Sequence, residues 1–116
     1  MNVGEIWVAS GKGLTGKPRP VLVLQSSDIS SVETIVVSLF STFQDSKSGL
    51  RYLVQANDAN GLKEDSYVMV DKLYAIPRTN FMKKQGELTP QQVYEVEKLL
   101  LKLIDFDKIE QGVTEI

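Results

Sequence analysis

The sequence predicts a mainly β domain, a small and strongly curved β-barrel followed by one C-terminal α-helix. Short segments rich in β-branched residues are separated by Gly, Asn and Ser turn signals at close spacing. After them, apolar residues recur at three- and four-residue steps, which is typical of a helix. We expect residues 1–116 to form a single domain, since no repeat, low-complexity tract or linker divides the chain.

Apolar runs identify the strands. The run from Val21 to Leu24 and the run from Thr34 to Phe40 contain little polar alternation, which indicates strands covered on both faces or at a barrel wall. In chain order, we expect strands within residues 4–9, 21–24, 34–40, 50–55 and 66–76.

Turn signals separate the later elements. Asn60-Gly61 is the dipeptide that most readily adopts the positive φ values of a tight turn. Pro77 ends the long strand that follows, because proline cannot donate to a strand ladder. We expect residues 81–84 to form a short connector and residues 85–88 to form a last short strand.

The final helix has a well-defined start. Thr89 supplies an N-cap hydroxyl, Pro90 occupies the first helical position, and Gln92 is the reciprocal capping residue. We expect the helix to extend over about residues 90–106 and to be followed by a short tail.

The predicted helix carries a wide apolar surface. One face holds Val93, Val96, Leu100, Leu103 and Ile104, and Leu99 and Leu101 widen it. The excess apolar area either packs across the barrel mouth or forms a self-association surface. We expect a homodimer, because a domain of this size has little else to cover the helix with.

Composition excludes several classes of function. The chain has no Cys and no His, so it lacks disulfides, thiol nucleophiles and the commonest general base and metal ligand. No apolar run approaches the roughly 18 residues of a membrane span, and the start of the chain lacks signal-peptide order. We expect a soluble, cytoplasmic protein. The glycines of residues 10–17 match neither a P-loop nor a dinucleotide fingerprint, so we expect no nucleotide cofactor.

The charge is unevenly distributed. The net charge is −2, yet residues 1–86 carry ten Lys or Arg against eight Asp or Glu, whereas residues 87–116 carry three against seven. A cationic groove in the body can therefore bind phosphate despite the negative total. The alternative is a set of ordinary solvated faces with an acidic helix.

Arg19 is the candidate for a positioned cation. It lies between Pro18 and Pro20, whose rings fix φ near −65° and push each preceding residue toward extended geometry. The buried strand behind it provides a rigid support. The alternative role for Arg19 is that of a structural ion-pair partner at the end of a loop.

The order of motifs resembles the MazF/PemK toxins, the ribonuclease components of bacterial type II toxin–antitoxin systems. These toxins share an SH3-like barrel with the CcdB gyrase poisons. The matching segments, in family order, are residues 4–7, 19–24, 41–42, 61–68, 71 and 86–90. The resemblance implies a homodimeric, metal-independent endoribonuclease that cleaves single-stranded RNA, such as mRNA, at specific sequences by 2′-hydroxyl attack. It also implies inhibition by a cognate antitoxin protein.

The resemblance assigns catalytic residues as well. Arg19 matches the catalytic arginine, which stabilises the phosphate, with leaving-group protonation as a second role. Ser41 matches the catalytic threonine best, and Thr42 is the alternative. Since side chains alternate across a strand, we expect only one of the two to face the site. Asp71 lies where some members carry a carboxylate proposed as base or base reader.

Four further cations are candidate phosphate contacts for RNA, namely Lys12, Lys17, Lys47 and Arg51. Each site residue also has an ordinary structural role open to it, since Ser41 and Thr42 can satisfy backbone groups at a strand end. One alternative function remains at this point: a catalytically silent barrel of the same fold that acts by binding, as a gyrase-type poison or a partner-binding module.

Overall fold

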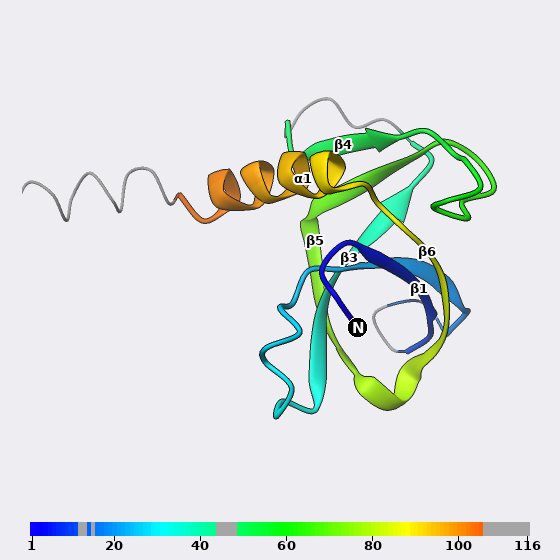
Figure 1. Cartoon of the computed structure of the whole chain (residues 1–116), viewed down its shortest axis with the longest axis vertical. Helices are drawn as coiled ribbons and strands as arrows, with labels where there is room; N and C mark the ends of the chain where they lie inside the picture. The colour runs from blue at the N-terminus through cyan, green and yellow to red at the C-terminus, as the bar shows by residue number, and fades with distance from the viewer. Residues whose placement is uncertain (12–13, 15, 44–48, 106–116) are drawn as a thin grey trace, which may run out of the picture.

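The computed structural model describes residues 1–11, 14, 16–43 and 49–105, and in this part of the chain it contains a curved antiparallel sheet and one α-helix (Figure 1). The elements in chain order are β1 (Glu5–Ala9), β2 (Arg19–Val23), β3 (Thr34–Ser41), β4 (Arg51–Val54), β5 (Ser66–Pro77), the 3₁₀ turn η2 (Arg78–Asn80), β6 (Phe81–Glu87) and α1 (Pro90–Leu103). The six strands follow the order β4-β5-β3-β2-β1-β6. The predicted mainly β fold with a C-terminal helix is confirmed.

The long strand β5 bends because its pairing with β3 is irregular. Ser38 opposes Leu73, but the next residue of β3, Leu39, opposes Met69, so three residues of β5 bulge out between them. The buried Ser38 hydroxyl donates a hydrogen bond to the Met69 carbonyl at 2.6 Å. The Val70 N–H donates instead to the Leu50 carbonyl at 3.0 Å, just before β4. The bulge thus curves the sheet and brings β4 against the first part of β5.

The two edge strands of the sheet, β4 and β6, are bridged by the loop that follows β4. The backbone N–H of Glu87 donates to the Ala59 carbonyl at 3.0 Å. The side-chain Nε2 of Gln85 donates to the Gly61 carbonyl at 2.9 Å. Residues 55–65, which we call the docking loop, therefore close the barrel where direct strand pairing stops.

Two apolar clusters fill the interior. The first lies beneath α1 and contains Ile6, Leu22, Val54, Leu62, Val68, Val70, Leu88 and Val96. The second lies on the other side of the sheet and contains Ala9, Leu14, Val21, Val23, Ile35, Val37 and Ile76. The rings of Trp7 and Phe81 pack edge to face beside the second cluster, with centroids 6.3 Å apart. The strands β1 and β2 contribute to both clusters, and for β2 this agrees with the unbroken apolar run that predicted a strand covered on both faces.

Helix α1 begins with the predicted capping box. The Gln92 N–H donates to the Thr89 hydroxyl at 3.2 Å, and the Thr89 N–H donates to Gln92 Oε1 at 2.9 Å. The helix ends at Leu103, earlier than the expected residue 106, and Asp105 adopts a left-handed φ of 59° that stops helical geometry. No helix in the described ranges is long and apolar enough to cross a membrane.

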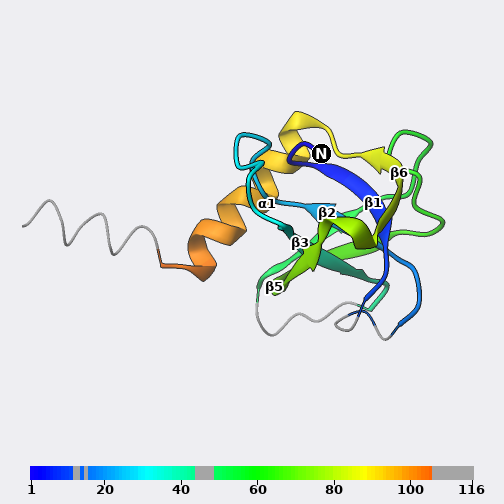
Figure 2. The same ribbon diagram turned by 90° about the horizontal axis from the view of Figure 1, so that it is seen from below.

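The C-terminal half of α1 extends away from the barrel, as two perpendicular views show (Figures 1 and 2). Val96 in the first half is buried in the core. Leu101, Leu103 and Ile104 near the end of the helix are 41%, 39% and 54% exposed. The first half of the helix therefore covers the barrel, and these three residues near its end present apolar surface to solvent within this chain.

One sequence prediction was wrong. Residues 81–84 were expected to connect two strands, but they form the first half of β6, which pairs with β1 from Phe81 to Glu87. The register of this pair shifts at two places, so the side chains of β6 do not alternate regularly between the two faces. The adjacent Lys83 and Lys84 also have low strand propensity. Both features remove the pattern by which a strand is recognised in a sequence.

Candidate functional site

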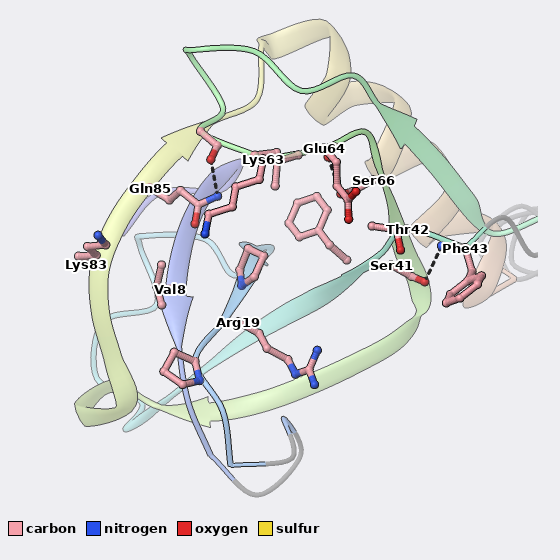
Figure 3. Close-up of a pocket in the computed structure, with 15 residues that line it drawn as sticks. Val8, Arg19, Ser41, Thr42, Phe43, Lys63, Glu64, Ser66, Lys83 and Gln85 are labelled. Atoms are coloured by element: carbon pink, nitrogen blue, oxygen red, sulfur yellow. Dashed lines mark hydrogen bonds between the residues drawn. The ribbon is translucent and has the colours of Figure 1, made fainter.

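A pocket of about 680 Å³ lies at one side of the barrel. Its lining comes from β1, the start of β2, the end of β3, the docking loop, the start of β5 and β6 (Figure 3). The polar side chains that line it are Arg19, Ser41, Thr42, Lys63, Glu64, Ser66, Lys83 and Gln85. Among these described lining residues, cations outnumber carboxylates, which favours an anionic ligand.

The position of the pocket follows from the register of the sheet. Val8 of β1 pairs with Pro20 of β2 on one side and with Lys83 of β6 on the other. Directly paired residues project from the same face of a sheet, so these three form one row across the strands. All three line the pocket, and the row is therefore part of its wall.

Arg19 is the first residue of β2 and is held from the preceding loop. Its Nε donates a hydrogen bond to the carbonyl of Leu14 at 3.1 Å, and Leu14 is 1% exposed in the core. The Leu14 N–H in turn donates to the Gly11 carbonyl at 3.0 Å. Figure 3 shows the guanidinium directed toward the side of the pocket on which Ser41 lies. This hydrogen bond from the loop adds to the local constraint of the two flanking prolines.

Ser41 and Thr42 both line the pocket, although only one of them was expected to face it. The expectation assumed a continuous strand, but β3 ends at Ser41, so the alternation of side chains stops there. The Phe43 N–H donates to the Ser41 hydroxyl oxygen at 3.1 Å. Ser41 is half-buried and Thr42 is exposed, which leaves the Ser41 hydroxyl as the better-oriented donor toward a ligand.

Asp71 and Arg51 do not lie where the sequence analysis expected them. Neither lines the pocket, and they pair with each other, with 3.1 Å between Arg51 Nε and Asp71 Oδ1. Asp71 belongs to the bulged part of β5, and Arg51 opposes Met69 two residues before it. The ion pair gives both side chains a structural role, and a catalytic Asp71 and a phosphate contact by Arg51 stay predictions.

The lysines of the site are different from those expected. Lys17 is exposed and does not line the pocket, whereas Lys12 and Lys47 lie outside the described residues. Lys63 and Lys83 line the pocket and were missed. A single lysine in a turn or an irregular strand gives no sequence signal. The available clues were that Lys63 follows the Asn60-Gly61 turn closely and lies within the matching segment 61–68.

The docking loop carries Lys63 and Glu64 into the pocket and is tightly held. Its centre is Asn60, which is 1% exposed. Asn57 and Asn60 exchange backbone-to-side-chain hydrogen bonds of 3.1 and 2.8 Å, and the Leu62 N–H donates to the same Asn60 oxygen at 3.0 Å. These bonds replace a regular ladder, so the loop presents its side chains from a fixed backbone.

Two glycines allow the docking loop to touch the backbone of β6. A Cβ atom on Gly61, whose φ is +69°, would lie 2.5 Å from the Gln85 carbonyl oxygen. A Cβ atom on Gly86 would lie 2.4 Å from the Asn60 carbonyl carbon. The loop and the strand are therefore in direct backbone contact, which any larger residue at either position would disrupt.

Among residues 1–11, 14, 16–43 and 49–105, no three Asp, Glu, His or Cys side chains converge to form a metal site. The features present are a held guanidinium, two hydroxyls and further cations around one pocket. Such donors suit the recognition of a phosphate group. In structural class, the chain is therefore a small β-barrel with a cationic pocket and a projecting C-terminal helix.

Comparison with known proteins identifies the family. Residues 2–104 match the family of PemK-like, MazF-like toxins of type II toxin–antitoxin systems, and the chain belongs to this family. It is 31% identical over 102 residues to a protein named "Probable endoribonuclease MazF" from Mycolicibacterium smegmatis, covering 87% of this chain and 94% of that protein.

Solved structures share the fold. The Mycobacterium tuberculosis toxin MazF-mt6 superimposes with a TM-score of 0.74 at 24% identity, over 87% of this chain and 96% of that one. A mycobacterial endoribonuclease, solved in complex with its cognate antitoxin, superimposes with a TM-score of 0.75 at 15% identity, over 90% and 95% of the two chains. The resemblance inferred from the motif order is confirmed.

Proposed function

We propose that this chain is the toxin of a type II toxin–antitoxin system and cleaves single-stranded RNA at specific sequences without a metal ion. The observation that carries the proposal is the convergence of Arg19, Ser41 and Thr42 on one pocket. The family match and the naming of the 31% identical relative as an endoribonuclease support it.

The chemistry is a transesterification within the RNA. The 2′-oxygen attacks the adjacent phosphorus and loses its proton, and the bond from phosphorus to the 5′-oxygen breaks. The products are a 2′,3′-cyclic phosphate and a 5′-hydroxyl, which gains a proton. Negative charge grows on the phosphoryl oxygens in the transition state, where a positioned cation and oriented donors stabilise it most. We assign this role to the Arg19 guanidinium and the Ser41 hydroxyl, with Thr42 as a secondary contact.

The cations on the docking loop and β6 bind the RNA backbone in this proposal. Lys63 and Lys83 are added to the expected contacts, while Lys12, Lys17, Lys47 and Arg51 remain candidates outside the described pocket lining. Because phosphate contacts contribute affinity without reading sequence, loss of either lysine weakens binding to all RNAs alike.

Two protein partners complete the proposal. The exposed apolar end of α1, formed by Leu101, Leu103 and Ile104, forms part of a homodimer interface. A cognate antitoxin inhibits the toxin by covering the cationic pocket beside Arg19 with an acidic segment. The solved complex of a mycobacterial endoribonuclease with its antitoxin supports such a partner. A cytoplasmic location accords with an RNA substrate.

Cleavage of a long unstructured RNA in the presence of EDTA tests the function. We expect discrete fragments with 5′-hydroxyl ends, which polynucleotide kinase labels without prior phosphatase treatment. Arg19→Ala abolishes cutting, while Lys72→Ala, at an exposed position outside the pocket lining, cuts normally. Circular dichroism checks that both variants fold.

The contrary outcomes are distinct. A wild-type protein that leaves several RNAs intact, or an Arg19→Ala variant that cuts as well as wild type, overturns the nuclease proposal. Retention of RNA or protein binding without cutting supports the binding-only barrel instead. Loss of cutting only when EDTA is added overturns the metal-free mechanism and leaves the nuclease in place.

A further inference from the structure

We propose that Gln85 determines part of the sequence specificity by accepting a hydrogen bond from the 6-amino group of adenine or the 4-amino group of cytosine at one position of the RNA. The inference rests on the proposed function in one respect, namely that RNA occupies the pocket. It assigns to Gln85 a preference for adenine or cytosine over guanine or uracil at a single position.

The orientation of the Gln85 amide is fixed by its partner. Nε2 donates to the Gly61 carbonyl at 2.9 Å, and a carbonyl oxygen can only accept. The reverse orientation would place two acceptors against each other, so the oxygen and nitrogen positions are settled by chemistry. Within the described ranges, no donor is hydrogen-bonded to the remaining oxygen, Oε1. Gln85 therefore has a single amide orientation, which presents Oε1 as an acceptor beside the second Nε2 N–H.

The partner that fixes the amide is itself immobilised. Gly61 is in backbone contact with Gln85, because even a Cβ atom on Gly61 would lie 2.5 Å from the Gln85 carbonyl oxygen. On the strand side, the Glu87 N–H bonds to the Ala59 carbonyl at 3.0 Å. On the loop side, buried Asn60 organises the turn. The side-chain amide of Gln85 is thus held by a partner whose own backbone is fixed, as selective recognition requires.

Gln85 also lies at the right place for reading a base. It lines the same pocket as Arg19 and Ser41, and Figure 3 shows it on the opposite side of that pocket from Ser41, with Lys63 on its own side. A phosphate held by Arg19 and Ser41 leaves a neighbouring base to extend toward the wall that contains Gln85. The side chain is half-buried, so a mismatched base there cannot recover its lost hydrogen bond fully from water.

The selection follows from the functional groups of the bases. Adenine N6 and cytosine N4 carry N–H donors, whereas guanine O6 and uracil O4, at the corresponding ring positions, are acceptors. Where Oε1 meets the group at purine C6 or pyrimidine C4, it therefore pairs with the amine of adenine or cytosine and opposes the keto oxygen of guanine or uracil. One neutral hydrogen bond of this kind gives a discrimination of roughly 3- to 10-fold.

Binding of uncleavable oligonucleotides tests the inference separately from catalysis. The probes are 2′-O-methyl RNA strands, whose blocked 2′-oxygen cannot attack. Fluorescence anisotropy measures their Kd values, which are compared in two pairs: all-adenosine with all-inosine, and all-cytidine with all-uridine. Inosine differs from adenosine by a keto oxygen in place of the amine. We expect wild-type protein to bind the amino strand of each pair 3- to 10-fold more tightly.

Variants assign that preference to Gln85. Gln85→Leu removes the acceptor at similar volume, so its Kd values within each pair should agree within about twofold. Met82→Leu is the matched control, because Met82 lies on the same strand, is 60% exposed and does not line the pocket. It retains the wild-type preference. Thermal unfolding confirms that both variants are folded.

The binding measurements either support or overturn the role of Gln85. Equal affinities in wild type, no measurable binding, or an unchanged preference in Gln85→Leu overturns the role of Gln85. Amino-base preference that disappears in Gln85→Leu supports it, even if wild-type protein cuts no RNA and the proposed nuclease function fails. If cutting does occur, mapped sites must share an adenine or cytosine at one position, and a set of sites without one also overturns the inference.

Discussion

Arg51 and Asp71 form an ion pair across β4 and β5, with 3.1 Å between Nε and Oδ1 and side chains that are 10% and 23% exposed. The pair stands beside the bulge at which β5 loses its register with β3. It therefore ties the short edge strand β4 to the bent part of β5. This geometry makes Asp71 a structural residue of the barrel wall.

Substitution of Asp71 should lower stability without removing activity. Asp71→Asn leaves the Arg51 guanidinium without its carboxylate, and we expect a loss of about 1–2 kcal/mol in the free energy of unfolding, between the values for exposed and buried pairs. Urea unfolding measures this loss, with Glu97→Gln on the exposed face of α1 as control. Cleavage per folded molecule stays within about threefold of wild type. A hundredfold fall in the cleavage rate of folded Asp71→Asn would instead indicate a catalytic role for Asp71.

The two hydroxyls at the end of β3 should differ in importance. Ser41 is half-buried and its hydroxyl oxygen is held by the Phe43 N–H, whereas Thr42 is exposed. Ser41→Ala therefore removes an oriented donor, with an expected loss of about 10²- to 10³-fold in the single-turnover cleavage rate. Thr42→Ala should lose about tenfold or less. The reverse order of effects would identify Thr42 as the main donor.

Gly86 should tolerate no side chain. In Gly86→Ala the new methyl group would meet backbone atoms of Ala59 and Asn60 at 2.4–2.5 Å, which only a shift of the docking loop can relieve. We expect a destabilisation of about 3 kcal/mol or more, measured by urea unfolding. Gly16→Ala is the control, because Gly16 has a φ of +77° but no atom within 4 Å of the added Cβ. Its cost is the backbone strain alone, about 1 kcal/mol. Equal losses in the two variants would show that the loop adjusts freely.

Glu5 should make stability depend on pH in acid. Burial alone would raise its pKa, but hydrogen bonds from the Trp7 indole, at 2.8 Å, and from the Asn2 backbone, together with Lys84, hold the pKa below its ordinary value of 4.5. The folded state therefore binds this proton less readily than the unfolded chain does. The ionised carboxylate contributes its full stability above the unfolded-state value and loses it as the pH falls through the lowered pKa.

Unfolding experiments in urea at a series of pH values check this effect. Glu5→Gln should reduce stability at neutral pH and flatten its decline below about pH 4.5, since glutamine does not titrate there. Glu97→Gln, on the exposed face of α1, should leave the decline unchanged. A Glu5→Gln variant with the wild-type slope in this range would place the titrating group elsewhere.

Most of the fold could be predicted from the sequence, because local patterns there agree with the tertiary packing. The unbroken apolar runs became β2, which contributes to both apolar clusters, and β3, whose buried apolar residues lie in the second cluster. The capping residues around Thr89 placed the start of α1 correctly. Arg19 could be recognised since two prolines constrain it locally.

The rest depended on contacts between distant segments. Strand β6 was missed because two register shifts against β1 break its alternation. The pairing of Asp71 with Arg51 results from the β5 bulge, and no pattern within either segment encodes it. Lys63 reaches the pocket from the docking loop and Gln85 from β6, and the contact between this loop and this strand joins residues about two dozen positions apart. Lys12 and Lys47 lie outside the described residues.

Two side chains of the docking loop line the pocket without helping to hold the loop in its fold. Asn57, Asn60 and backbone groups hold the loop, and in the described part of the chain the side chains of Lys63 and Glu64 make no hydrogen bond or ion pair that supports it. Both side chains are exposed and line the pocket. Substitutions there can change the charge that meets a ligand while the barrel stays intact. Relatives can therefore differ in ligand affinity through these two positions at little cost to stability.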